Sequence, residues 1–221
     1  MNYRKLGKTG LQVSEIGFGG EWLERHPEED GVALIKYAAQ KGINVIDCWM
    51  ADPKSRDIIG KAMEGNRSHW IVQGHIGSTW QNGQYVRTRD MKYVVPAFED
   101  LLKRLRTDYV DLGMIHYVDA REDWDKILNS DFLRYVKELK ESGKIRHIGL
   151  STHNPVIAKL AVESGFVEML LSPSILHSTC VLRRRRLMIF SENMTQRCLA
   201  LILSAPPSTS SARKRKLELP S

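Results

Sequence analysis

The chain has 221 residues, of which 42% are hydrophobic and 27% are charged. These fractions are typical of a globular protein with one sizeable core and exclude disorder throughout. The net charge of +7 belongs to the C-terminal end: residues 172–221 hold nine of the 33 Lys and Arg but only two of the 26 Asp and Glu. Residues 1–171 are therefore neutral, and the charge indicates no nucleic-acid or membrane partner for them.

The cysteines and the N-terminal segment indicate the cellular compartment in which the protein is expected. Cys48, Cys180 and Cys198 are odd in number and widely spaced, without a Cys-x-x-Cys pair. This pattern favours neither a disulfide framework nor a zinc cluster, and it fits a reducing compartment. The N-terminus lacks an apolar signal segment, and no run of 18 apolar residues occurs. We expect a cytoplasmic protein.

In chain order, the pattern begins with a predicted β-hairpin and continues as a repeat of strand, turn and helix. In residues 2–17, apolar and polar residues alternate on either side of a glycine-rich turn, and this pattern predicts the hairpin. Short apolar runs then predict six strands, at 15–19, 43–49, 70–76, 109–116, 145–151 and 167–171. Helical spacing between them predicts helices near 29–41, 55–64, 88–106, 123–142 and 155–164. Alternating strands and helices indicate an α/β fold with a parallel sheet.

Polar residues gather where the predicted strands end, as Asp47, His75, His116 and Ser151 do. In a (β/α) barrel, the carboxyl ends of the strands build the active site. A doubly wound sheet is the structural alternative. It is less favoured because a Gly-x-Gly-x-x-Gly loop after the first strand is missing.

The composition changes abruptly near Ser172. Residues 172–221 contain a run of four arginines, a Pro/Ser/Thr patch and a second basic cluster, but no further strand and helix unit. We therefore divide the chain into a partial barrel, 1–171, and a basic low-complexity tail, 172–221. The tail's one structural candidate is a short helix over 191–203. The abrupt change suggests a shifted reading frame or a mispredicted gene end, and a sheet stopped at six strands would have two open edges.

Four blocks of residues 3–154 carry a specific pattern: YRKLGKTGLQVSEIGFG (3–19), GINVID (42–47), LLKRLRTDYVDLGMIH (101–116) and GKIRHIGLSTHN (143–154). In this order and spacing they resemble the aldo-keto reductase family, over residues 3 to about 171. The resemblance implies a TIM-type (β/α) barrel of that family's kind, of which this chain holds the first six β/α units, preceded by the β-hairpin.

The family's reaction transfers a hydride between a nicotinamide cofactor and a carbonyl or alcohol. A tyrosine, activated by a lysine that an aspartate orients, supplies the proton, and a histidine positions the carbonyl. The resemblance places the aspartate at Asp47 and the histidine at His116. It places Asp52 where the tyrosine is usual and His75 where the lysine is usual.

These departures leave three interpretations open. Asp47, Asp52, His75 and His116 form a replaced catalytic set in which a histidine handles the proton. Alternatively, they are polar remnants of an inactive barrel, or two histidines and two aspartates resemble a divalent-metal site, although we assign no metal ligand. Trp49, Trp80 and Tyr117 are further candidates to line a substrate site, but aromatic residues near strand ends more often serve packing.

The resemblance further implies NADPH or NADH as the cofactor, with Gly20, Asp47, Ser151 and Thr152 as its contacts. Thr152 stands where asparagine is usual. We expect a small carbonyl substrate and no membrane or nucleic-acid partner. The rival interpretation is a non-enzymatic scaffold whose arginine clusters in the tail bind phosphate backbones or direct localisation.

Overall fold

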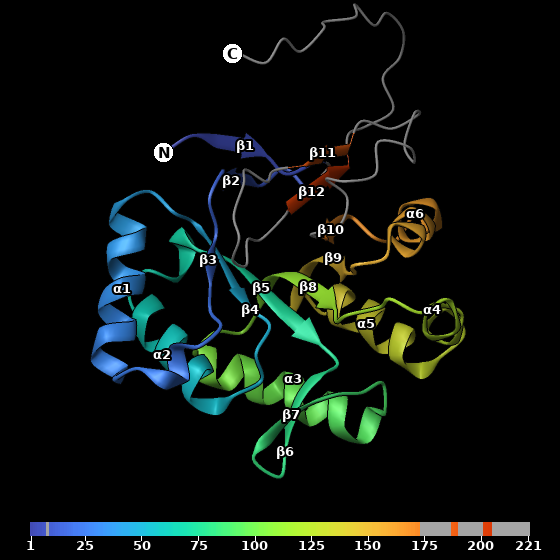
Figure 1. Cartoon of the computed structure of the whole chain (residues 1–221), viewed down its shortest axis with the longest axis horizontal. Coiled ribbons are helices and arrows are strands. Elements are labelled where there is room, and N and C mark those ends of the chain that lie inside the picture. The colour runs from blue at the N-terminus through green and yellow to red at the C-terminus, as the bar shows by residue number, and fades with distance from the viewer. Residues whose placement is uncertain (8, 173–186, 190–200, 205–221) are drawn as a thin grey trace, which may run out of the picture.

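The computed structural model describes residues 1–7 and 9–172, together with the backbone of 187–189 and 201–204. Its centre is an eight-stranded sheet in the order β11-β12-β10-β9-β8-β5-β4-β3. The six strands from β3 to β10 run parallel and lie beside helices, as Figure 1 shows. This arrangement confirms an α/β fold with six parallel strands, curled as in part of a (β/α) barrel.

The six parallel strands match the predicted apolar runs. They are β3 (Phe18–Gly19), β4 (Val45–Cys48), β5 (Ile71–Ile76), β8 (Val110–Ile115), β9 (Ile145–Ser151) and β10 (Met169–Leu171). The helices are α1 (Glu28–Gln40), α2 (Pro53–Met63), α3 (Met91–Leu105), α4 (Arg121–Leu128), α5 (Asp131–Glu141) and α6 (Pro155–Ser164), with 3-10 turns at Leu23–Arg25 and Arg67–His69.

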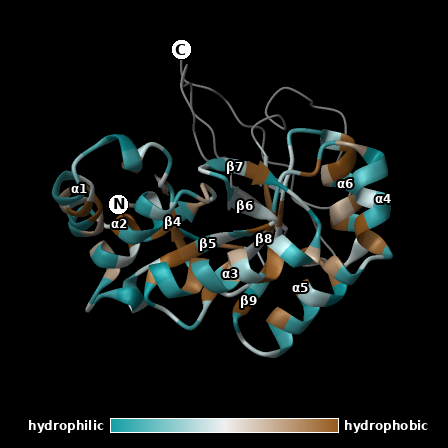
Figure 2. Ribbon diagram, turned by 90° about the horizontal axis from the view of Figure 1, so that it is seen from below, coloured by the Kyte–Doolittle hydropathy of each residue, from teal (hydrophilic) through white to brown (hydrophobic). Residues whose placement is uncertain are grey.

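Side chains of the strands alternate between two apolar clusters. One cluster lies between the sheet and the helices and includes Ile46, Val72 and Ile115. The other lies on the concave face of the sheet and includes Val45, Ile71 and Leu112. In Figure 2 the helices mix teal and brown segments around their axes, as expected of elements with one buried side.

The predicted N-terminal hairpin is present as β1 (Tyr3–Lys5) and β2 (Gln12–Ser14). Its Leu6 and Val13 belong to the concave-face cluster, so the hairpin covers the amino-terminal end of that cluster. Asn44, just before β4, holds it there: the Asn44 side chain accepts a hydrogen bond from Ser14 N–H and donates one to the Gln12 carbonyl. The hairpin thereby places the open end of the sheet on the opposite, carboxyl-terminal side.

Two elements differ from the sequence prediction. The single helix expected over 123–142 is wrong: the chain forms α4 and α5 instead, because Ser130 caps a new helix by accepting a hydrogen bond from Leu133 N–H. An unpredicted second hairpin, β6 (Ser78–Gln81) and β7 (Gln84–Arg87), follows β5 at its carboxyl end. Figure 1 shows this hairpin at the end of the molecule opposite to β1 and β2.

Two short strands beyond residue 172 extend the sheet. β12 (Leu201–Ser204) pairs antiparallel with β10, and β11 (Leu187–Ile189) pairs with β12. The prediction of an open sheet edge at the sixth strand, β10, is therefore wrong. The helix expected over 191–203 is wrong at residues 201–203, which are extended, while residues 191–200 lie outside the described part of the chain. Within the described residues, no helix is long and apolar enough to cross a membrane.

Candidate active site

Three neighbouring strands bring Asp47, His75 and His116 to one place. Alternate residues of a strand face the same side, so Asp47 shares the concave face with Val45, and His75 shares it with Ile71. His116 follows β8 on the same alternation as Leu112. All three side chains come from the carboxyl ends of β4, β5 and β8, which lie next to one another in the sheet.

The three side chains form a continuous row of hydrogen bonds. His75 Nε2 lies 3.0 Å from Asp47 Oδ1, and His75 Nδ1 lies 2.8 Å from His116 Nδ1. Asp47, His75 and His116 are only 5%, 3% and 5% exposed. Such burial shields the row from water, which strengthens hydrogen bonds and makes an unpaired polar group costly.

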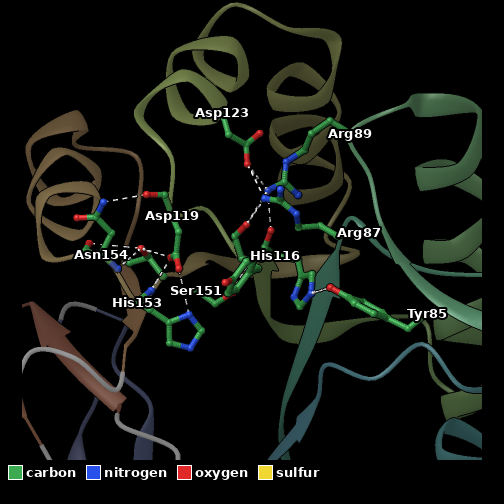
Figure 3. A network of polar contacts seen from close by, with 11 residues as sticks. Tyr85, Arg87, Arg89, His116, Asp119, Asp123, Ser151, His153 and Asn154 are labelled. Carbon is green, nitrogen blue, oxygen red and sulfur yellow. Dashed lines mark hydrogen bonds and ion pairs between the residues drawn. The ribbon is translucent and has the colours of Figure 1, made fainter.

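A fourth residue, Tyr85 of β7, completes the row. Its hydroxyl lies 2.6 Å from His116 Nε2. A dashed line marks this contact in Figure 3. The row therefore runs Asp47, His75, His116, Tyr85, and both ring nitrogens of each histidine are occupied. We call these four residues the polar relay.

The surroundings fix the relay in place. The Trp49 ring stacks on His116 at 5.9 Å between ring centres and meets the Tyr85 ring edge-on at 5.5 Å. Arg89 donates to the His116 carbonyl at 2.6 Å and pairs with Asp123, which Arg87 also contacts (Figure 3). Asp123 of α4 thus holds both arginines, which donate to the carbonyls of the loop that carries His116.

Burial sets the protonation of two relay members. The pKa of His116 lies well below its ordinary 6.5, because burial disfavours the imidazolium and because His75, Arg89 and Arg87 add positive charge nearby. Burial also raises the pKa of Tyr85, an effect that Arg87 and Arg89 reduce. At neutral pH, His116 is a neutral ring and Tyr85 holds its proton.

Asp52, the fourth expected catalytic residue, lies outside this row. Its carboxylate accepts a hydrogen bond from Ser55 N–H at 2.9 Å and caps the N-terminus of α2. An aspartate at this position satisfies a helix N–H that would otherwise have no partner. The capping contact gives Asp52 a role in folding that its position in the sequence pattern did not reveal.

The residues expected to contact the cofactor differ in whether a hydrogen-bond donor is available. Ser151 Oγ accepts a hydrogen bond from Tyr117 N–H at 2.7 Å, which leaves its hydroxyl hydrogen available to donate. The Thr152 hydroxyl donates to Asp119 Oδ1 at 2.9 Å and holds the loop before α6. Gly20 lies so close to β4 that a Cβ atom there would come within 2.6 Å of the Asp47 carbonyl oxygen.

The described residues contain no group of three or more His, Cys, Asp and Glu side chains arranged to hold a metal ion. The relay explains why its own members do not form one. A histidine ligates a metal through a ring nitrogen lone pair, and here the ring nitrogens face Asp47, one another and Tyr85.

Sequence reasoning missed Tyr85, although a signal for it exists. Asn82-Gly83 separates two short β-prone runs, and this dipeptide is the preferred turn of a two-residue hairpin. Both residues have positive φ, 51° and 78°, as such a turn requires. Recognition of the hairpin would have placed Tyr85 opposite Trp80, at the carboxyl end of β5.

Comparison with known proteins agrees with this geometry. The model of the aldo/keto reductase family matches residues 15–179. The chain is 32% identical over 160 residues to the aldo-keto reductase YhdN of Bacillus subtilis, covering 68% of this chain and 47% of YhdN. It is 32% identical over 157 residues to L-galactose dehydrogenase of Arabidopsis thaliana, covering 67% of this chain and 47% of that enzyme.

Among solved structures, the holo form of aldo-keto reductase AKR11C1 from Bacillus halodurans superposes with a TM-score of 0.67 at 29% identity, covering 78% of this chain and 57% of that one. An aldo/keto reductase from Klebsiella pneumoniae in complex with NADP and acetate, at 22% identity and a TM-score of 0.50, shares the fold. The chain thus spans about half the length of the relatives it matches.

Proposed function

Since the chain belongs to the aldo/keto reductase family, we propose that it acts as a nicotinamide-dependent oxidoreductase that interconverts a small carbonyl compound and its alcohol. The observation that carries this proposal is the buried row Asp47–His75–His116 at the carboxyl ends of three parallel strands. In a barrel of this kind, the carboxyl ends of the strands are where catalytic side chains lie.

The proposal assigns the proton chemistry to Asp47, His75 and His116. A neutral, buried His116 can pass a proton between its two hydrogen-bond partners, His75 and Tyr85. Because the Asp52 carboxylate is engaged at the start of α2, a catalytic role for it stays a prediction from the sequence.

A bound NADPH or NADH supplies the hydride to the carbonyl carbon. Ser151 fits the carboxamide of such a cofactor, because its hydroxyl hydrogen is available at the carboxyl end of β9. Thr152 fits less well, since its hydroxyl already donates to Asp119. Gly20 would contribute by leaving room beside β4, where a side chain would collide with the Asp47 carbonyl.

The partner we propose is a small carbonyl or alcohol, and the compartment we propose is the cytoplasm. The compartment rests on two features: the sequence has no Cys-x-x-Cys pair, and Cys48 is buried and unpaired. The Cys48 side chain faces the helices, and burial raises the pKa of its thiol to about 12, so it takes no part in the site.

The proposed function is tested by titrating the protein with NADPH and NADH, followed by turnover assays with a panel of aldehydes and quinones. We expect saturable binding of at least one cofactor and oxidation of it that depends on the carbonyl compound. Absence of binding by both cofactors would remove the proposal and leave an inactive relative of the family.

A matched pair of variants examines the cofactor contact. Ser151→Ala removes the proposed hydrogen bond to the cofactor, worth about 1 kcal/mol, and should weaken cofactor binding about fivefold. It also removes the acceptor of Tyr117 N–H, so the free energy of unfolding is measured beside binding. Ser68→Ala removes an exposed hydroxyl near the amino end of β5, the opposite end from the relay, and should leave binding unchanged. Equal effects of both substitutions would contradict the assignment of Ser151.

A further inference from the structure

We infer that Tyr85 is the proton donor and acceptor of this enzyme, and that His116, His75 and Asp47 supply and remove its proton. This inference rests on the proposed function and assigns to Tyr85, on the β6–β7 hairpin, the work expected of a tyrosine at the position of Asp52. Its basis is the unbroken row of contacts from Tyr85 Oη to Asp47 Oδ1, at 2.6, 2.8 and 3.0 Å.

When both histidines are neutral, the donor and the acceptor of each hydrogen bond in the row are determined. The Asp47 carboxylate can only accept, so His75 Nε2–H donates to it. His75 Nδ1 then has no hydrogen, and His116 Nδ1–H donates to it. His116 Nε2 in turn accepts the hydrogen of the Tyr85 hydroxyl, so both ring nitrogens of each histidine have a partner.

The row has a second arrangement that contains one more proton. In it, the added proton is shared by Asp47 and His75, His75 Nδ1–H donates to His116 Nδ1, and His116 Nε2–H donates to Tyr85 Oη. The Tyr85 hydrogen is then free to point at a substrate oxygen. Each hydrogen bond survives the change, which requires only that a proton crosses each contact.

Alcohol oxidation converts the first arrangement into the second. A bound oxidised nicotinamide would accept the C–H electron pair as hydride, and the alcohol O–H proton would go to Tyr85 Oη. At the same time, the Tyr85 proton moves to His116 Nε2, and the His116 Nδ1 proton moves to His75 Nδ1. This last transfer is the one proton that the Asp47–His75 pair gains. Carbonyl reduction is the same step in reverse, with reduced nicotinamide as the hydride source.

This arrangement explains how a tyrosine can act without a neighbouring lysine. Burial raises the pKa of Tyr85, so a free tyrosinate would be costly there. In the relay, the Tyr85 phenol loses one proton as it gains another and stays neutral. The added positive charge appears at the Asp47–His75 pair instead. A carboxylate in contact with an imidazole is suited to that charge.

Tyr85 is also held where its hydroxyl can contact both His116 and a substrate. Its side chain is half-buried, whereas the other three relay residues are buried. The hairpin that carries it is tied to the barrel, because Ser78 donates to the Trp49 carbonyl at 2.6 Å and Arg87 donates to the Tyr117 carbonyl at 2.7 Å. Tyr85 is therefore the relay member that a substrate can reach.

The experiment replaces Tyr85 with phenylalanine, which keeps the ring that packs on Trp49 and removes the hydroxyl. We expect kcat to fall at least about 100-fold, the lower range for loss of a general acid, while cofactor affinity and KM change less than about threefold. Tyr93→Phe is the matched control, because Tyr93 is exposed on α3 and should leave kcat unchanged.

A second readout does not depend on turnover. Nitrogen-15 NMR of the histidine rings should show His116 Nε2 as a hydrogen-bond acceptor, and Tyr85→Phe should shift that signal while the signal of His69 stays in place. His69 is a suitable reference because its ring contacts the Ile43 carbonyl at the amino end of the sheet.

The outcomes separate the inference from the proposed function. Turnover that survives in Tyr85→Phe within threefold, or a His116 signal that does not move, would overturn the relay while the oxidoreductase function stands. Absence of cofactor-dependent turnover in the unsubstituted chain would remove the function and, with it, the catalytic role of Tyr85.

Discussion

At the scale of single residues, His116 makes stability depend on pH. Its pKa is lowered in the folded chain, so between 6.5 and that lower value the unfolded chain binds the proton and the folded chain does not. Stability from this residue is therefore present above pH 6.5 and is lost as the pH falls. One unmatched proton corresponds to a slope of about 1.4 kcal/mol per pH unit.

We expect the free energy of unfolding, measured by urea titration, to fall between pH 7.5 and pH 5. His116→Asn should flatten this slope, because asparagine does not titrate, whereas substitution of the exposed His26 should leave it unchanged. A slope that persists in His116→Asn would assign the effect to another group.

Glu168 does not contribute in that pH range. Burial acts to raise its pKa, but hydrogen bonds from His147, Lys140 and Ile148 N–H outweigh burial and lower the pKa to about 2. A carboxyl with a lowered pKa stabilises the fold above its unfolded value and loses that contribution only as pH falls below about 4.5. The two residues can therefore be distinguished by the pH at which stability declines.

Asp111 is the second residue with a testable role, at the amino end of the sheet. Its buried carboxylate contacts Arg67 at 2.9 Å, Arg146 at 3.0 Å and Val72 N–H at 3.0 Å, and so joins β5, β8 and β9. Asp111→Asn leaves the partly buried Arg67 without a counter-charge and should cost about 3 kcal/mol in thermal or chemical unfolding. Asp125→Asn, in an exposed pair with Arg121, should cost less than about 0.5 kcal/mol.

At the scale of elements, the β6–β7 hairpin connects backbone conformation to the catalytic role proposed for Tyr85. Gly83 has φ of 78°, and a Cβ atom there would meet nothing within 4 Å, so its requirement for glycine comes from the backbone alone. Gly83→Val should therefore destabilise the turn by about 1–2 kcal/mol without disturbing the core. We expect faster hydrogen exchange at the hairpin amides and a lower kcat, with little change in global unfolding.

Gln84→Ala is the control for this variant, because Gln84 is exposed on the same hairpin and has no positive φ. It should change neither hydrogen exchange nor kcat appreciably. If Gly83→Val loosens the hairpin and kcat is unaffected, the position of Tyr85 on that hairpin does not matter for the reaction.

At the scale of the whole molecule, β12 protects the edge of the parallel sheet. It pairs with β10 through residues 201–203, so the backbone groups of β10 are not exposed as a template for another chain. A chain that ends at Ser172 should self-associate more than one that ends at Ser204, which keeps β11 and β12. Size-exclusion chromatography with light scattering measures the difference, and identical behaviour of the two chains would show that the pairing gives no protection.

Local patterns in the sequence predict the six parallel strands in chain order and the end of the sheet at which Asp47, His75, His116 and Ser151 lie. Strand alternation and helix spacing are local properties of the chain, so they can be found without knowing which strands are neighbours. The split between α4 and α5 depends on one serine cap, which the helical periodicity on either side concealed.

Which polar side chains touch depends on how the strands are arranged in space. His75 and His116 are separated by 41 residues, and Tyr85 and His116 by 31, so their contacts depend on the stagger of neighbouring strands and on the path of the β6–β7 hairpin. The same holds for β12, whose pairing with β10 follows from a free strand edge. Asp52 differs, because its contact is a local one with Ser55 N–H at the start of α2. These contacts form because buried polar atoms and strand edges must find partners, and the chain's fold determines which partners are within reach.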